Sequence, residues 1–198
     1  MIVKNLPKEP IQTAARFLEI EAKVPLNAIY KAYHTQGRHD DDFNSVDLAS
    51  DILGRSKSSR FYTKLVKENK IFNSVNAYVT ASLDPGLLMI QGNLNAGVSI
   101  EEGDAAIQDV LDDYLKNPIS EEELSKVKNQ AESTLVFSEV ELLNRAMNLA
   151  FAANAGNVEY ANQESAKIQA VTTVSLMNQA KRILSKENCS TMYYLAIN

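Results

Sequence analysis

Two histidines and three neighbouring aspartates form the densest group of side chains in this sequence that could bind a metal. His34 and His39 are five residues apart, and Asp40, Asp41 and Asp42 follow directly. Imidazole nitrogens and carboxylate oxygens are both ligands for zinc. A simpler interpretation is that His34 ends a strand and the aspartates begin a helix, where negative charge is favourable. We expect the simpler interpretation to hold.

The single cysteine, Cys189, is the next candidate for chemistry. It excludes an internal disulfide and a cysteine-based metal cluster. It lies at the start of an apolar, strand-like segment, and no basic neighbour in sequence is present to lower its pKa. We therefore expect a buried, inert thiol rather than a nucleophile.

The remaining polar clusters also have structural explanations. Glutamates 101–102 and 121–123 lie where helices should begin, so they do not indicate paired catalytic carboxylates. The tyrosine pairs Tyr30/Tyr33 and Tyr193/Tyr194 are expected to pack on the sheet. The sequence contains no HExxH, HxxEH, G-x-S-x-G, P-loop or G-x-G-x-x-G motif. It therefore predicts no catalytic site and no metal or cofactor site within this chain.

The composition excludes two classes of partner. The formal net charge of −5 offers no basic surface for a phosphate backbone, so we expect no nucleic-acid partner. No apolar run approaches the roughly 20 residues that a membrane-spanning helix needs, so we expect no membrane span.

The first half of the chain alternates between strands and helices. Residues 1–12 contain two prolines and read as a linker or lead-in. Residues 16–24 alternate between apolar and charged side chains, which predicts a half-buried strand, and 26–35 predict a second strand. A helix is expected over 42–53, with Gly54 as its C-terminal stop.

The stretch from Gly54 to Asn95 predicts a turn, a short helix and a hairpin. The turn covers 54–59, and the helix after it places Phe61, Leu65 and Val66 on one side. Alternation from Ile71 to Ala81, an Asp-Pro-Gly turn and a further strand over 87–95 form an antiparallel hairpin signal.

The second half of the chain predicts mainly helices. Ser99 with Glu102 and Ser120 with Glu123 are capping boxes. The second of these helices should bury two offset apolar stripes, with a kink or break near Ser138 between them. The members of these stripes are Leu124, Val127, Ala131 and Leu135, then Leu142, Leu143, Met147 and Ala150. Thr173 is the expected N-cap of a last helix, and 191–197 a closing strand.

Paired strands with helices segregated between them predict an α+β fold. We expect a mostly antiparallel sheet with helices packed on one face, in a single domain over 13–198 that follows the lead-in 1–12.

One series of residues has a recognisable pattern. It reads G-x-x-x-S-S-R-F-Y-x-x-L-V-x-E over 54–68 and S-V-x-A over 74–77. It resembles the second, non-zinc, C-terminal domain of the M16 (pitrilysin/insulinase-type) zinc peptidases. Further segments match the same family in order: P-x-Q at 10–12, I-S-E-E-E-L-x-x-V-K-N-Q at 119–130, I-Q-A-V-T at 168–172, and A-x-x-I-L at 180–184.

This resemblance implies an M16/LuxS-like half-unit with a specific role. The chain would be a non-catalytic domain that forms chamber wall and partner interface for peptide substrates. The parent would be a zinc-dependent endopeptidase, with zinc held by an HxxEH domain outside this chain. Implied partners are that N-terminal domain and a second M16-like half, as a homodimer or heterodimer. A bacterial periplasm or cell envelope is implied only by the resemblance.

The family's second domain can supply an Arg and a Tyr, seven residues apart, that hold substrate near the metal. The corresponding positions here are Val66 and Asn73, which lack a guanidinium and a phenol. Such a loss fits the zinc-bearing half of a pair, which often lacks these residues. It also fits the alternative of a structural or interaction subunit of M16-like fold with no protease activity. A third reading, independent of the family, is a binding module that uses its sheet face or acidic loop.

Overall fold

The computed structural model describes residues 9–197, which form one mixed five-stranded sheet and a layer of helices. The strand order is β1-β5-β2-β4-β3, and only the β1–β5 pair is parallel. The α+β fold with a mostly antiparallel sheet is therefore confirmed. The strands are β1 (Arg16–Ala22), β2 (Ala28–Thr35), β3 (Phe72–Val79), β4 (Gly86–Leu94) and β5 (Cys189–Ala196).

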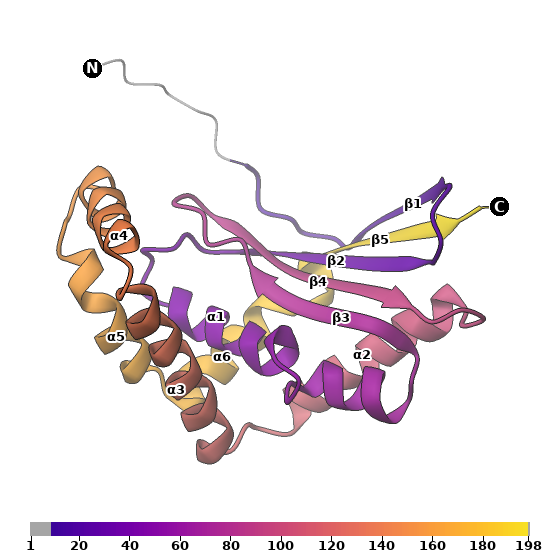
Figure 1. Cartoon of the computed structure of the whole chain (residues 1–198). Helices are drawn as coiled ribbons and strands as arrows, with labels where there is room; N and C mark the ends of the chain where they lie inside the picture. The colour runs from indigo at the N-terminus through magenta and orange to yellow at the C-terminus, as the bar shows by residue number, and fades with distance from the viewer. Residues whose placement is uncertain (1–8, 198) are drawn as a thin grey trace.

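The helices lie on one face of this sheet and leave the other face open (Figure 1). α4 projects beyond one end of the sheet, and β1 with β5 extends at the other. The helical segments are α1 (Phe43–Ser50), η1 (Asp51–Arg55), η2 (Tyr62–Glu68), α2 (Ile100–Lys116), α3 (Glu121–Ser138), α4 (Leu142–Asn154), α5 (Tyr160–Ala170), α6 (Thr173–Ile183) and η3 (Lys186–Asn188).

The core fills the space between the sheet and the helical layer. Its largest fully buried side chains are Tyr114, Phe61, Phe72, Ile29, Leu48, Leu53, Leu65, Leu88, Ile90, Leu94, Ile107 and Leu111. They come from β2, β3, β4, α1, α2 and the two π-helical segments η1 and η2, together with Phe61, the residue before η2. The predicted inward side of the helix after Gly54 is confirmed, because Phe61 and Leu65 are fully buried.

Gly54 is not the helix stop that the sequence predicts. The helix continues through it as η1, with i→i+5 winding, and ends at Arg55. A Cβ at position 54 would lie 2.1 Å from the backbone nitrogen of Ala77. Glycine is needed here because η1 packs directly on β3, which is a close approach rather than a left-handed cap.

The prediction of a half-buried strand over 16–24 is wrong in its burial. β1 ends at Ala22, and Arg16 to Glu21 are exposed on both faces of the strand. Phe17 is 61% exposed and Leu18 is 53% exposed. The reason is position: β1 is an edge strand whose only neighbour is β5, beyond the cover of the helices.

The predicted break near Ser138 is confirmed, because α3 ends there and α4 begins at Leu142. The predicted burial of the second stripe is wrong. Leu142 is 78% exposed, Leu143 is 69% exposed, and only Ala152 of α4 is buried. α5 is a separate helix that the sequence pattern did not predict, and the N-cap of α6 is Thr172 rather than Thr173.

The fold has no helix within residues 9–197 that is long and apolar enough to cross a membrane.

The lead-in over 1–12 and the domain over 13–198 stay predictions, and residues 1–8 of that lead-in lie outside the described part. Gln12 is buried, and its amide donates to the carbonyls of Glu187 and Cys189 at 3.1 and 3.0 Å. The chain is therefore already attached to the sheet at this point.

Candidate functional site

The structure does not assemble the histidines and aspartates of the 34–42 segment into a metal site. The His39 ring stacks on Tyr160 with 4.3 Å between ring centroids. Burial and the neighbouring Arg38 lower the pKa of His39. His34 Nε2 lies 4.0 Å from a carboxylate oxygen of Glu9. Among residues 9–197, no group of three histidine, cysteine or acidic side chains could hold a metal ion. The residues present do not fit zinc.

Cys189 is buried, as predicted, at the start of β5. Its Sγ lies 3.5 Å from Thr191 Oγ1. Burial raises the pKa of Tyr33, and contact with the Cys189 sulfur raises it further. Nothing in this arrangement activates the thiol, since both neighbours are neutral hydroxyls.

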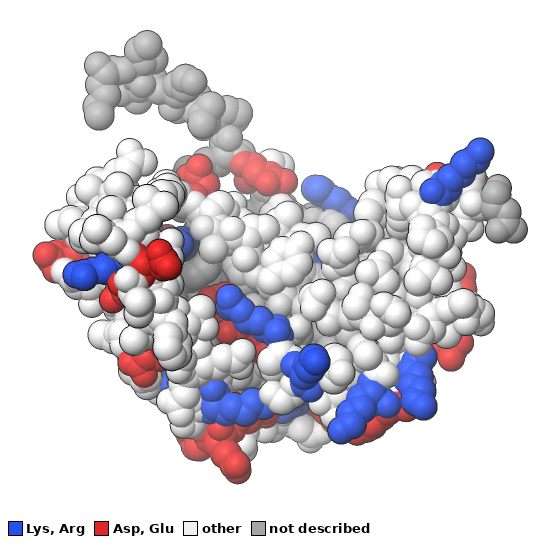
Figure 2. Space-filling model, in the orientation of Figure 1, with Lys and Arg blue, Asp and Glu red and all other residues white. Residues whose placement is uncertain are grey.

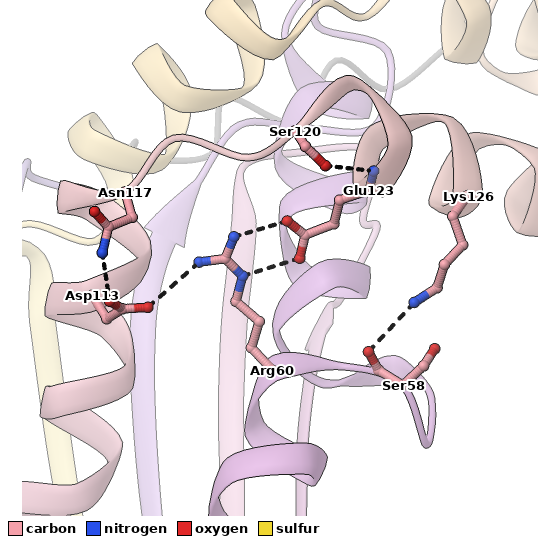
Figure 3. Close-up of polar contacts among 7 residues, drawn as sticks. All are labelled: Ser58, Arg60, Asp113, Asn117, Ser120, Glu123 and Lys126. Carbon is pink, nitrogen blue, oxygen red and sulfur yellow. Dashed lines mark hydrogen bonds and ion pairs between the residues drawn. The ribbon is translucent and has the colours of Figure 1, made fainter.

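The Ser-Ser-Arg segment of the family pattern forms the most connected polar site. Arg60 donates two hydrogen bonds to the Glu123 carboxylate, from Nε at 3.0 Å and Nη2 at 2.8 Å (Figure 3). Its Nη1 lies 3.8 Å from Asp113 Oδ2, and the guanidinium stacks 5.0 Å above the Tyr114 ring. The Glu123 hydrogen bonds raise the pKa of Arg60. This bidentate geometry is the strongest form of Arg–carboxylate contact.

The same site joins three elements that are distant in sequence. Lys126 Nζ of α3 donates to the carbonyl of Ser58 at 3.4 Å, beside the Arg60 contacts (Figure 3). Ser120 Oγ accepts from the Glu123 backbone N–H at 3.1 Å and caps α3. The Glu123 side chain faces Arg60, although the predicted capping box directs it back to Ser120. The 58–60 segment therefore anchors the start of η2 to α2 and α3.

Val66 and Asn73, the positions matched to the family's Arg and Tyr, lie in different surroundings. Val66 is half-buried in η2 and packs against the core. Asn73 is exposed in β3, at an irregularity of the ladder between Phe72 and Ser74. Neither residue lines the groove between η2 and α2. Their assignment to substrate positions stays a prediction.

The open face of the sheet is rich in apolar and aromatic side chains. Alternation and register put them on the face opposite the helices: Leu18 and Ile20 of β1, Met192 and Tyr194 of β5, Tyr30, Ala32 and His34 of β2, Leu87, Met89 and Gln91 of β4, and Asn76 and Tyr78 of β3. The two tyrosines 193 and 194 point to opposite faces, because Tyr193 OH donates to Asp104 of α2 at 3.0 Å.

A second uncovered apolar surface lies at the junction of α3 and α4. We call it the α3–α4 surface, and its members are Val136, Phe137, Val140, Leu142, Leu143, Met147, Leu149 and Phe151. They are 46–78% exposed. Arg145 is the one charged residue of α4. In Figure 2, α4 and the visible part of the sheet are nearly free of charge, whereas charged groups gather along the helical side.

The chain folds as an α+β domain in which helices cover one face of the sheet and the other face is open. Residues 9–197 contain no metal-binding cluster. Residues 3–131 match the family model described as the peptidase M16 inactive domain. The chain belongs to this family.

Several solved structures with the same fold are described as bacterial proteases or as domains of putative ones. A protease from Helicobacter pylori superposes with a TM-score of 0.92 at 18% identity, covering 98% of this chain and 48% of that chain. The inactive peptidase domain of a putative zinc protease from Bordetella parapertussis gives 0.81 at 21% identity, covering 88% and 94%. The first half of the periplasmic protease PqqL from Escherichia coli gives 0.77 at 15%, covering 98% and 45%.

This chain therefore spans about half the length of the Helicobacter pylori protease chain. Among curated proteins, none matches the sequence.

Proposed function

We propose that this chain is the non-catalytic C-terminal domain of an M16-like zinc metallopeptidase. In this proposal the zinc and its HxxEH ligands lie in a domain outside this chain. The open face of the sheet forms part of the wall of a substrate chamber, and the α3–α4 surface forms a partner interface. The observation that carries the proposal is the open sheet face in a chain of this family.

The chemistry of the open face suits unfolded peptides. Leucine, isoleucine, methionine and tyrosine side chains give apolar area, and Gln91 Nε2 with Tyr30 OH, 3.4 Å apart, gives polar groups beside it. Tyrosine is enriched at interfaces because its ring is apolar and its hydroxyl can hydrogen-bond. Such a face attracts peptides without demanding one sequence, which supports a wall rather than a specificity pocket.

The α3–α4 surface supports the partner interface by its size. Eight large apolar side chains, each 46–78% exposed, gather at this junction, and a standard interface takes about 800 Å² from each partner. Exposed patches on isolated monomers are typically about 300–600 Å². The proposed occupant is the zinc-bearing domain of the parent or a second M16-like half.

Val66 and Asn73 bear on which half this chain belongs to. We propose that they occupy the positions of the family's substrate-holding Arg and Tyr, so this domain contributes no charge to substrate binding there. This supports a place in the zinc-bearing half of a pair. The same two residues favour the second candidate, a structural subunit of M16-like fold with no protease activity.

A peptidase assay tests the proposal directly. The isolated chain should hydrolyse no unfolded peptide in a chelator-sensitive manner, and it should bind no stoichiometric zinc. The zinc-bearing protein that contains or accompanies this domain should cleave, and lose activity with chelator. A parent region that lacks HxxEH would exclude the peptidase role and leave the structural subunit.

Photocrosslinking in the complete assembly tests whether the open face of the sheet forms part of the chamber wall. A photoreactive residue in place of Met89, on the open face, should crosslink to bound peptide. The matched control is Asp112, which is exposed on the helical side in α2. Equal crosslinking at both positions, or none at position 89, contradicts the wall. The periplasm or cell envelope remains the proposed compartment, as for the PqqL neighbour.

A further inference from the structure

A groove separates η2 from α2 on the helical side of the sheet. Its volume is about 730 Å³, within the range of about 300 to 1,000 Å³ that is usual for ligand sites. Apolar side chains line it on both sides: Leu65 of η2 and Ile71, which directly precedes β3, on one side, and Ala105, Ala106 and Val110 of α2 on the other.

One wall of the groove is a single stripe of α2. The lining residues 102, 105, 106, 109, 110 and 113 recur at helical spacing. With a rise of about 1.5 Å per residue, this stripe is roughly 16 Å long, or three turns. The groove therefore has the length of a short helix, not of a single side chain.

The other wall is wound in an uncommon way. In η2 the backbone N–H of Asn69 donates to the carbonyl of Lys64 at 2.9 Å, which is an i→i−5 bond. π-helical winding is rare and is found disproportionately at functional sites. The π-helical segment η2 lies beside the groove, and Lys64 and Asn69, the two residues of this bond, both line the groove.

The charges on the rim are unequally compensated. Arg60 is neutralised by Glu123, and Lys64 Nζ lies 3.1 Å from Glu68 Oε2. Glu102 and Asp109 also line the groove, and neither has an ion-pair partner within residues 9–197. With Asp113, the rim carries three carboxylates against two cations that already have partners, so its net charge is negative.

We propose that this groove binds a basic amphipathic helix of a partner protein. Its apolar stripe would lie on Ala105, Ala106 and Val110, and its lysines or arginines would face Glu102 and Asp109. A helix satisfies its own backbone hydrogen bonds, whereas an extended peptide would find no strand edge in a groove between two helices. The acidic rim selects a cationic partner.

This partner is distinct from the peptide proposed for the open face, because the groove lies on the helix-covered side of the sheet. The inference does not depend on the proposed function, and the two can fail separately. A chain with no protease partner would still bind the helix.

The test is fluorescence anisotropy with the whole chain and a labelled helical Leu/Lys peptide of about five turns. Wild-type protein should bind it one to one with micromolar affinity, and a Leu/Glu peptide of the same pattern should not bind. Asp109→Lys and Ala105→Trp should each weaken binding by about tenfold or more. Both positions are exposed, so the variants should fold, which circular dichroism checks.

The matched control is Asp112→Lys, which makes the same charge change on an exposed position of α2 outside the groove. It should change affinity less than twofold. Equal weakening by Asp109→Lys and Asp112→Lys would show general attraction to an acidic protein and overturn the proposal. So would unchanged affinity in Ala105→Trp, or a failure of the wild type to bind the Leu/Lys peptide.

Discussion

Helices α2 and α4 are both rich in apolar residues, and the fold treats them in opposite ways. α2 buries seven residues, among them Ile107, Leu111 and Tyr114, and exposes a row of carboxylates. α4 buries only Ala152 and has a single charge, Arg145. An amphipathic helix such as α2 needs cover only for its apolar face, and in α2 the core supplies that cover. The five large apolar side chains of α4, in contrast, are left 46–78% exposed by the rest of residues 9–197.

The largest expected effect comes from paired truncations that sharpen this comparison. Leu111→Ala in α2 should lower the free energy of unfolding by about 3 kcal/mol, because it removes a fully buried side chain. Leu143→Ala in α4 should change it by less than about 0.5 kcal/mol in the isolated chain. Urea titrations followed by circular dichroism measure both. Similar losses in the two variants would contradict the assignment of α4 as uncovered.

A second test concerns the buried carboxyl group of Asp51 in η1. Burial, together with the neighbouring Asp47, raises the pKa of Asp51 to about 6. An acid whose folded pKa is raised stabilises the fold only while protonated. Its contribution is therefore lost as pH rises from about 4 through 6, by roughly 3 kcal/mol for a shift of about two units.

Asp51→Asn should flatten this part of the pH dependence of the unfolding free energy. Unfolding titrations at pH 4.5 and pH 7 in both proteins measure it. The Arg55 contact at 2.9 Å strengthens when Asp51 ionises, so it opposes the loss of stability, and its effect is already contained in the raised pKa of Asp51. An unchanged slope in the variant would show that Asp51 does not titrate in this range.

The Arg60 site tests whether α2 and α3 are held together by polar contacts. Arg60→Ala should cost about 1 to 2 kcal/mol, because Glu123 loses two charge-assisted hydrogen bonds in a partly exposed position. Arg60→Lys is the matched control that keeps the charge and loses the bidentate geometry. It should recover less than half of the loss. Full recovery would show that charge alone matters.

A charge on the α3–α4 surface should have the smallest effect on stability but a clear effect on association. Leu143→Glu should leave the unfolding free energy within about 0.5 kcal/mol of wild type, since this side chain is 69% exposed. In the isolated wild-type chain we expect this exposed apolar surface to cause concentration-dependent self-association, which sedimentation velocity measures. Leu143→Glu should abolish it. Wild-type protein that stays monomeric at all concentrations would show that the α3–α4 surface needs its specific partner.

Local signals predicted much of the fold. The alternation of β3 and β4 and the Asp-Pro-Gly turn predicted their hairpin, which the register confirms. The serine caps were equally visible: Ser99 Oγ accepts from the Glu102 N–H at 3.1 Å. These features depend on residues that are neighbours in the sequence, so the sequence alone predicts them.

Features that depend on distant partners were missed. Arg60 and Glu123 are 63 residues apart, and only the family resemblance marked the first of them. Lys31 is buried in β2, where its Nζ lies 2.6 Å from Asp104 of α2, and no local pattern indicates this pair. The exposure of β1 and α4 was missed because periodicity does not reveal what covers an apolar face. In a domain of a larger assembly, that cover can be absent from the chain.

The parallel pairing of β1 with β5 has a consequence for the order of folding. β5 lies between β1 and β2, so β1 has no neighbour in the sheet until β5 is inserted. The ribosome finishes Ala22 long before it reaches Cys189, on the order of ten to thirty seconds at typical elongation rates. During that interval β1 has no strand partner within residues 9–197. Closing the sheet also joins segments of very high sequence separation, which slows folding. The strand of this sheet that is synthesised last, β5, is thus the one that completes the sheet.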